Sequence, residues 1–223
     1  MPPKKNIIIA GSSGMVGKEL LQICLHSNEV NTIYLLSRKP SQIKDSKVHE
    51  IIVDDFLNYH FIASIKDKID VVFYCIGVYT GAVEKKLFEQ ITFEYPVALA
   101  KSVVVNWPTT KFILLSGAGA DRTEKSRVEF AKYKGMAENQ LYHIFKSNFH
   151  SARPGYIYPI VKRQEPNFMY RMLRLLYPLL KWSGKKYSIT SVELARALFV
   201  LGKQIHRQIT FENEELVKIA TNK

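Results

Sequence analysis

Short apolar segments alternate with longer amphipathic segments over most of the chain. Brief runs rich in Ile, Val and Phe are typical of strands that are buried on both faces of a parallel sheet. Such runs predict strands at 6–10, 31–37, 48–53, 70–76, 111–116 and 148–153. The segments between and after them predict helices at 14–26, 58–66, 84–105, 126–146, 166–182 and 191–203. This alternation predicts an α/β fold with a doubly wound parallel sheet.

Prolines interrupt the regular alternation in the last third of the chain. They stand at Pro154, Pro159, Pro166 and Pro178. Proline breaks helices and is excluded from the middle of a sheet. We therefore expect a single domain over residues 1–223, in which residues 154–190 form a small C-terminal lid or substrate segment.

A glycine-rich turn follows the first predicted strand and opens the first predicted helix. It reads Gly11, Ser12, Ser13, Gly14, Met15, Val16 and Gly17. In dinucleotide-binding folds the first glycine of such a triplet makes a tight turn, and the second lets the backbone approach a pyrophosphate. The third lets the helix pack on the strand, and the helix N-terminus then faces the phosphates. This position predicts a Rossmann fold with a bound dinucleotide.

The second predicted strand ends at Ser37, and Arg38 follows directly. A carboxylate at this place would hold a ribose 2′-hydroxyl, whereas an arginine accommodates a 2′-phosphate. The sequence therefore favours NADP(H) over NAD(H). An exposed basic turn without a ligand is the alternative interpretation.

Three further strand ends carry candidate binding residues. Asp55, beside Phe56, either accepts from an adenine amino group or caps the next helix. Cys75, Ile76 and Gly77 end the fourth strand, where a glycine lets a ribose lie against the backbone. Ser116 ends the fifth strand and is positioned either to bond a substrate carbonyl or to form a turn.

Taken together, these features resemble the short-chain dehydrogenase/reductase superfamily, in particular its small, atypical NmrA-like and Tat-interacting-protein-like branch. The resemblance runs over essentially the whole chain. It rests on Gly11, Gly14, Gly17, Arg38, Asp55, Phe56, residues 75–77, Leu115, Ser116, residues 151–155 and residues 187–197. It implies a nicotinamide cofactor, with Pro154 and Gly155 near the nicotinamide.

The resemblance also implies an acid/base pair, a tyrosine and a lysine four residues apart on one helix. Here Lys134 matches the lysine, but Phe130 occupies the tyrosine position, and a phenyl ring exchanges no proton. Ser126 and Glu129 have the spacing of a capping box at the start of this helix. Either Tyr133 substitutes, or Tyr79 or Tyr156 reaches in, or the usual carbonyl chemistry is lost or redirected.

Composition and charge limit the kinds of partner that we expect for this chain. The chain has 223 residues and a net charge of +12, but its basic residues are dispersed, so we expect no nucleic-acid partner. Cys24 and Cys75 lie in apolar segments and are expected to be core thiols in a reducing compartment, not a disulfide or a metal site. We expect a cytoplasmic monomer or homodimer without a metal.

The predicted helix 166–182 carries Arg171, Arg174 and Lys181 on one face. We expect it to cover the substrate crevice or to pack on a second subunit; docking on an anionic membrane surface is the alternative.

Two functions of different classes follow from these features. One is an NADP(H)-dependent oxidoreductase acting on a small carbonyl compound, with Ser116, Lys134 and Tyr133 as candidate catalytic residues. The other is a non-catalytic NADPH-binding regulator or assembly factor with an unknown protein partner. An enzyme similar to sugar-nucleotide epimerases is a weaker third hypothesis.

Overall fold

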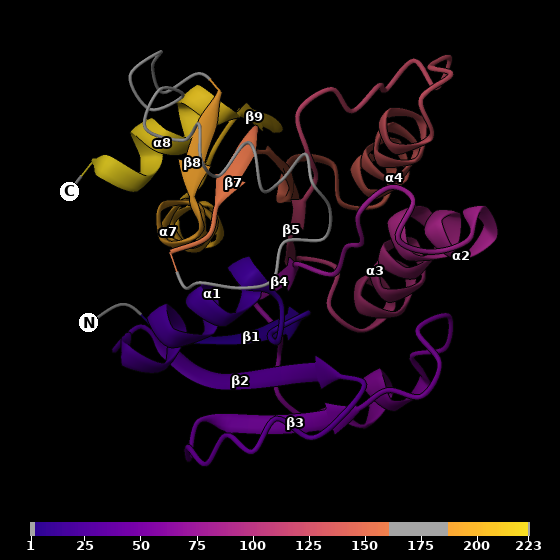
Figure 1. The fold of residues 1–223 in the computed structure, drawn as a ribbon. Coiled ribbons are helices and arrows are strands. Elements are labelled where there is room, and N and C mark those ends of the chain that lie inside the picture. The colour runs from indigo at the N-terminus through magenta and orange to yellow at the C-terminus, as the bar shows by residue number, and fades with distance from the viewer. Residues whose placement is uncertain (1–2, 161–186, 223) are drawn as a thin grey trace.

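Seven parallel strands form the central sheet of the computed structural model, which describes residues 3–160 and 187–222. The strand order is β3-β2-β1-β4-β5-β6-β9, so the order reverses between β1 and β4 (Figure 1). The strands are β1 (Lys5–Ala10), β2 (Val30–Ser37), β3 (Val48–Ile52), β4 (Val71–Tyr74), β5 (Lys111–Leu115), β6 (Phe149–Arg153) and β9 (Thr210–Glu212). This is the doubly wound α/β fold that the alternation predicts, and ligands of such folds bind at the carboxyl ends of the strands beside the reversal.

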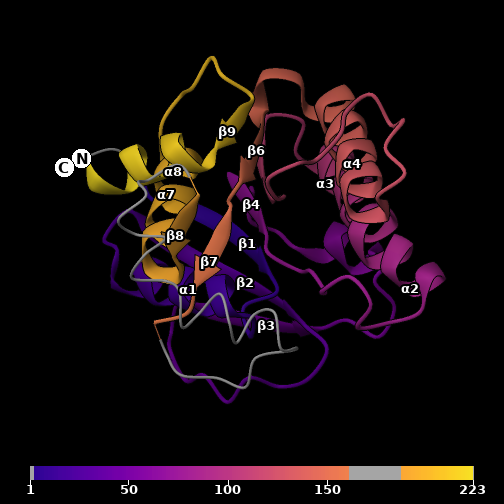
Figure 2. The same ribbon diagram turned by 45° about the horizontal axis from the view of Figure 1, so that its top comes forward.

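Helices cover both faces of the sheet (Figure 2). On one face lie α1 (Met15–His26), α7 (Ser191–Lys203) and α8 (Asn213–Thr221). On the other lie the 3-10 turn η1 (His60–Ser64), α3 (Tyr95–Asn106) and α4 (Glu129–Phe145). The strands are apolar on both faces for this reason: Ile7 and Ile9 enter the core under α1 and α7, and Ile8 enters the core under α3.

The six predicted strands are confirmed, and their ends differ from the prediction by at most two residues. The predicted helices at 14–26 and 191–203 are confirmed as α1 and α7. Thr190 and Glu193 form the capping box of α7. The predicted helix 166–182, with its basic face, lies outside the described residues.

Two predicted helices differ in their form. The segment 58–66 contains only the short 3-10 turn η1. The segment 84–105 is not one continuous α-helix, because α2 (Lys85–Glu89) and α3 are joined by the π-helical turn η2 (Gln90–Glu94). Pro96 lies in the first turn of α3 and has no N–H for an α-helical hydrogen bond, which favours an irregular turn before it.

The predicted capping box of α4 is wrong. The helix begins at Glu129, and Val128 occupies the N-cap without a side-chain hydrogen bond to the helix. The Ser126 hydroxyl instead accepts from the amide of Val128 at 3.1 Å. The carboxylate of Asp121 organises this loop, since it accepts from the amides of Ser126 and Thr123 at 2.8 and 2.9 Å.

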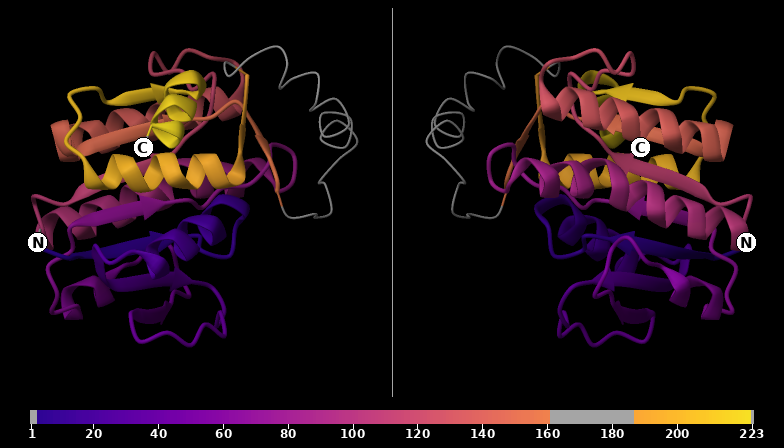
Figure 3. Two further views of the ribbon diagram at one scale, coloured as in Figure 1. Left: turned by 90° about the vertical axis from the view of Figure 1, so that its left-hand side faces the viewer. Right: turned by 90° about the vertical axis from the view of Figure 1, so that its right-hand side faces the viewer.

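Short elements near the C-terminus were not predicted. The strands β7 (Tyr156–Tyr158) and β8 (Ser188–Thr190) pair in parallel as a separate small sheet at one end of the domain (Figure 3). They are three-residue strands at the two ends of the predicted segment 154–190. The helix α8 was missed as well, although Glu212 and Glu215 form its capping box.

The close contact between α1 and the turn before it yields a stability prediction. A Cβ added at Gly17 would lie 2.1 Å from the carbonyl oxygen of Gly11, a backbone atom that cannot move aside cheaply. We expect Gly17→Ala to lower the free energy of unfolding by about 3 kcal/mol, at the upper end of overpacking effects. Urea unfolding measures this change. Gly77→Ala is the matched control, because a Cβ there meets nothing within 4 Å; equal losses in both variants would contradict the steric explanation.

Candidate cofactor and substrate site

A pocket of about 520 Å³ opens at the carboxyl ends of β1, β4, β5 and β6. Four loop or turn segments and two side chains of α4 line it. They are residues 14–16 at the start of α1, 75–80 after β4, 115–118 at the end of β5, 154–157 before and within β7, and Phe130 and Lys134. The pocket therefore lies beside the reversal of strand order between β1 and β4, where ligands bind in this architecture.

The glycine-rich turn is shaped by backbone contacts. Gly11 has φ +89°, and a Cβ there would lie 2.8 Å from the backbone of Cys75 and Ile76. Gly14 is the N-cap of α1 and provides no capping side chain, so the N-terminal amides of α1 keep their capacity to donate to a ligand. These amides and the helix dipole favour an anion at this end of the pocket.

Many of the residues predicted from the sequence meet at this pocket. Those that line it are Gly14, Met15, Val16, Cys75, Ile76, Gly77, Ser116, Lys134, Pro154 and Gly155. Gly11 and Gly17 shape the turn behind it, Ser12 is buried there, and Ser13 is exposed.

The remaining predicted binding residues lie on the same edge of the sheet but do not line the pocket. Ser37 pairs with Ile52, so Arg38 and Asp55 follow the ends of two neighbouring strands. Arg38 is exposed. The Asp55 carboxylate accepts from the amide of Leu57 at 2.9 Å and stabilises a local turn, while Phe56 is buried against Tyr95. The Asp55 carboxylate thus accepts a hydrogen bond within a turn and does not cap a helix.

Phe130 and Lys134 lie one helical turn apart and both face the pocket. The para carbon of the Phe130 ring would be 2.5 Å from a Cβ at Gly117, so this ring packs directly on the backbone after β5. The Lys134 ammonium donates to the carbonyl of Leu115 at 3.0 Å. Burial lowers the pKa of Lys134 to about 8, against the opposing attraction of Glu138 and then Cys75.

Tyr133 does not line the pocket. Its hydroxyl donates to the Glu89 carboxylate at 3.0 Å, and its ring packs on Phe88. Burial, followed by the hydrogen bond and charge of Glu89, raises the pKa of Tyr133 above its usual value of 10. The rotation around the helix between Phe130 and Tyr133 therefore directs this hydroxyl to α2, whereas Tyr79 and Tyr156 do line the pocket.

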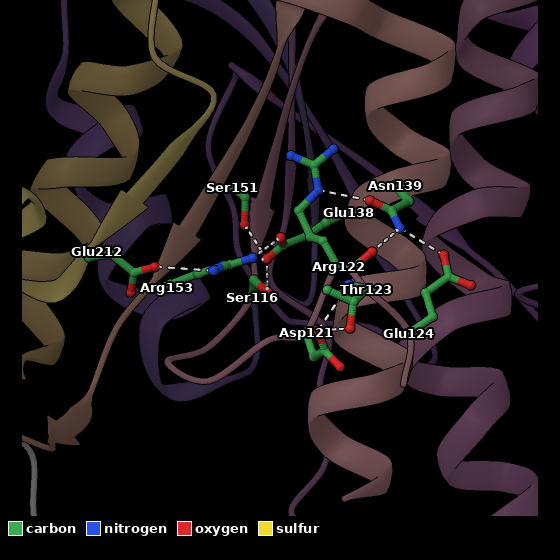
Figure 4. A network of polar contacts seen from close by, with 10 residues as sticks. All are labelled: Ser116, Asp121, Arg122, Thr123, Glu124, Glu138, Asn139, Ser151, Arg153 and Glu212. Carbon is green, nitrogen blue, oxygen red and sulfur yellow. Dashed lines mark hydrogen bonds and ion pairs between the residues drawn. The ribbon is translucent and has the colours of Figure 1, made fainter. Parts of the chain in front are cut away.

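Ser116 contacts Glu138, a residue that the sequence analysis did not assign to the site. The Ser116 hydroxyl donates to the Glu138 carboxylate at 2.6 Å (Figure 4). Glu138 is fully buried and forms an ion pair with Arg153. A signal for it existed, because a glutamate four residues after Lys134 falls on the face of the helix that also carries the core residue Leu141.

Comparisons with known proteins place the fold. No family model matches the sequence. The chain is 29% identical over 163 residues to the mitochondrial protein FMP52 of Debaryomyces hansenii, covering 70% of this chain and 68% of that protein. That name places the relative in mitochondria and gives no substrate.

Solved structures agree with the architecture. The Bordetella bronchiseptica enzyme WbmF in complex with NAD+ matches with a TM-score of 0.70 at 14% identity, over 98% of this chain and 77% of that chain. The carbonyl reductase Sniffer of D. melanogaster matches with a TM-score of 0.67 at 14% identity, over 95% of this chain and 98% of that chain. The UDP-N-acetylglucosamine 4-epimerase of Bacillus cereus matches with a TM-score of 0.68 at 16% identity, over 96% of this chain and 84% of that chain. At these identities the likeness establishes a Rossmann-like fold.

Among the described residues, no helix has the length and apolar character needed to cross a membrane.

The buried Lys134 yields a prediction on pH. Between its folded pKa of about 8 and the usual value of 10.5, the unfolded chain binds the proton that the folded protein has lost. Stability therefore rises with pH in this window. We expect the unfolding free energy of the wild type to gain about 2 kcal/mol relative to Lys134→Met between pH 8 and pH 10. Urea unfolding of both proteins at a series of pH values tests this, and parallel pH curves would contradict it.

Proposed function

We propose that the chain binds a nicotinamide dinucleotide and is an oxidoreductase of the short-chain dehydrogenase/reductase type, acting on a small carbonyl compound. One observation carries this proposal. The glycine-rich turn and the N-terminus of α1 open into the same pocket as Lys134 and Ser116. A phosphate-binding element and a buried cation thus share one site, as a pyrophosphate and a reacting group require.

The residues fit such a cofactor. A Cβ at Gly11 or Gly17 would collide with backbone, so only glycines give this turn its close packing. The amides at the start of α1 would hold the pyrophosphate, and Gly77 leaves room for a ribose against the backbone. Lys134 would donate to the other ribose, and Pro154 and Gly155 would form the wall beside the nicotinamide. When bound, the reduced cofactor supplies a hydride.

The NADP(H) preference is part of this proposal and is supported by Arg38. It follows β2 at the sheet edge that carries the pocket, and a guanidinium binds phosphate through paired N–H donors.

Phe130 supports a second candidate function, a non-catalytic NADPH-binding regulator or assembly factor. Its ring faces the pocket beside Lys134 at the position where the resemblance implies a tyrosine. A general acid typically contributes about 10²- to 10⁴-fold to a rate, so its loss is compatible with a protein that binds cofactor and turns over slowly. The cytoplasmic location stays a prediction.

Cofactor preference gives the first functional test. We expect NADPH to bind more tightly than NADH in a fluorescence or calorimetric titration. Arg38→Ala should weaken NADPH about 10- to 100-fold and leave NADH nearly unchanged, because a hydrogen bond to a charged group contributes about 1.5–3 kcal/mol.

Lys44→Ala is the matched control, since it removes one exposed positive charge from the loop that follows Arg38. Equal affinity for both nucleotides in the wild type, or equal weakening by the two variants, would remove Arg38 from this role.

Turnover gives the second functional test. We expect slow NADPH oxidation with simple aldehydes and ketones in the wild type. Phe130→Tyr should raise the rate by about 10²-fold or more by restoring a proton donor one helical turn from Lys134. The ring must shift slightly, because its para carbon lies against Gly117. Phe130→Leu controls for repacking and should give no gain. A fast wild type that loses its activity in Tyr133→Phe would identify Tyr133 as the acid and refute this reading of Phe130.

A further inference from the structure

A buried carboxylate lies beneath the pocket and receives four hydrogen bonds. Oε1 of Glu138 accepts from the hydroxyls of Ser116 and Ser151 at 2.6 and 2.7 Å. Arg153 donates from Nε to the same oxygen at 2.9 Å and from Nη2 to Oε2 at 2.5 Å. Figure 4 shows these side chains converging from the end of β5, from β6 and from α4. Every partner of this carboxylate therefore comes from an element that borders the pocket.

The directions of these hydrogen bonds follow from the chemistry of the groups. A guanidinium only donates, and the carboxylate that it pairs with only accepts. Both serine hydroxyls must therefore donate to Glu138. Ser116 has a single hydroxyl proton, so its oxygen keeps only acceptor capacity for anything else.

The two serines differ in one respect. Ser116 lines the pocket, whereas Ser151 is fully buried and does not line it. A ligand in the pocket thus meets a hydrogen-bond acceptor at Ser116. This arrangement is the reverse of a donor to a substrate carbonyl, which was one of the two roles that the sequence left open for Ser116.

The same carboxylate also fixes one wall of the pocket. Arg153 is held by Glu138 on one side and by Glu212 of β9 on the other, at 3.1 Å from Nη1. Pro154 and Gly155 follow Arg153 directly and line the pocket. The carbonyl of Pro154 accepts from the amide of Ala118 at 2.9 Å, which joins this wall to the loop after β5.

We propose that Glu138 is a positioning residue, which takes the hydroxyl proton of Ser116 and leaves the serine oxygen as a hydrogen-bond acceptor toward the pocket. The pocket then selects, at Ser116, a ligand group that donates a hydrogen bond, such as a hydroxyl or an amide N–H. The proposal rests on the proposed function only in that the pocket is the ligand site. Lys134 supplies the complementary donor nearby, since an ammonium carries three N–H groups and one of them reaches Leu115.

The test compares two probes with one carbon skeleton, 1-phenylethanol and acetophenone, titrated into the full chain and followed by amide NMR shifts. The measured quantity is the ratio of their dissociation constants, from which the general apolar affinity cancels. We expect Ser116→Ala to reduce the preference for the alcohol about 3- to 10-fold, the size of one hydrogen bond between neutral groups. Ser151→Ala removes an equal donor to the same oxygen and should leave the ratio unchanged.

Glu138→Asp tests the positioning role itself. It keeps a negative charge for Arg153 but withdraws the carboxylate from Ser116 by one methylene, which frees the serine proton toward the pocket, so the alcohol preference should fall as in Ser116→Ala. Glu138→Met is the second variant, because it keeps the length of the side chain and removes the acceptor altogether, and the ratio must shift in the same direction. A merely structural role would weaken both probes alike.

An unchanged ratio in Ser116→Ala or in a folded Glu138 variant would overturn the proposal, as would an equal shift in Ser151→Ala. Both probes lack a nucleotide, so a wild type that fails to bind NADPH but shows the expected ratios would refute the proposed function and leave the role of Glu138 standing. A wild type that binds NADPH, with ratios unchanged in the Ser116 and Glu138 variants, would refute the role of Glu138 and leave the proposed function standing.

Discussion

The burial of the parallel strands on both faces governs the rest of this molecule. Ile7, Ile8 and Ile9 are successive residues, and all three are buried, because one helical layer receives the odd positions and the other receives the even one. Such strands leave little room for polar side chains away from their ends, and the buried Ser151 of β6 is paired with Glu138. The pocket, the candidate phosphate-binding turn and the candidate catalytic groups therefore gather at the carboxyl ends of β1, β4, β5 and β6.

The helix α4 links that edge to the core. Phe130, Lys134 and Glu138 are spaced by four residues and form one stripe along the helix. The first two line the pocket, and the third lies beneath it among strand side chains. A buried ion pair such as Glu138–Arg153 is costly to desolvate, and removing one partner typically costs about 3–5 kcal/mol. The pocket floor is thus held by an interaction whose geometry must be complete to be favourable.

Sequence reasoning located what depends on local patterns. The strands, α1, α7 and the glycine-rich turn follow from apolar periodicity and from glycine spacing. Lys134 was assigned to the site by the resemblance to the short-chain dehydrogenase/reductase superfamily, and the structure places it in the pocket one helical turn from Phe130. The β7–β8 pairing escaped prediction because its strands are short and some thirty residues apart in sequence.

Other features depend on partners that the sequence does not show to be close. The direction of the Tyr133 hydroxyl is decided by Glu89, forty-four residues earlier in the chain. The direction of the Ser116 hydroxyl proton is set by Glu138, to which it donates. Ser126 does not cap α4, because it lies in a loop whose amides donate to Asp121. In each case a carboxylate that the fold brings close accepts the hydrogen bond, and such bonds are stronger than those between neutral groups.

The π-helical turn Gln90–Glu94 has a consequence for how this fold tolerates changes in chain length. A π turn holds one residue more than an α turn, and one residue corresponds to a rotation of about 100° around a helix. Deleting a single residue there would regularise the helix and turn α2 away from α4. Glu89 would then lose Tyr133, and Lys85 would lose Glu129, with which it forms an ion pair at 2.7 Å. The irregular turn thus sets the rotational position of α2 relative to α4.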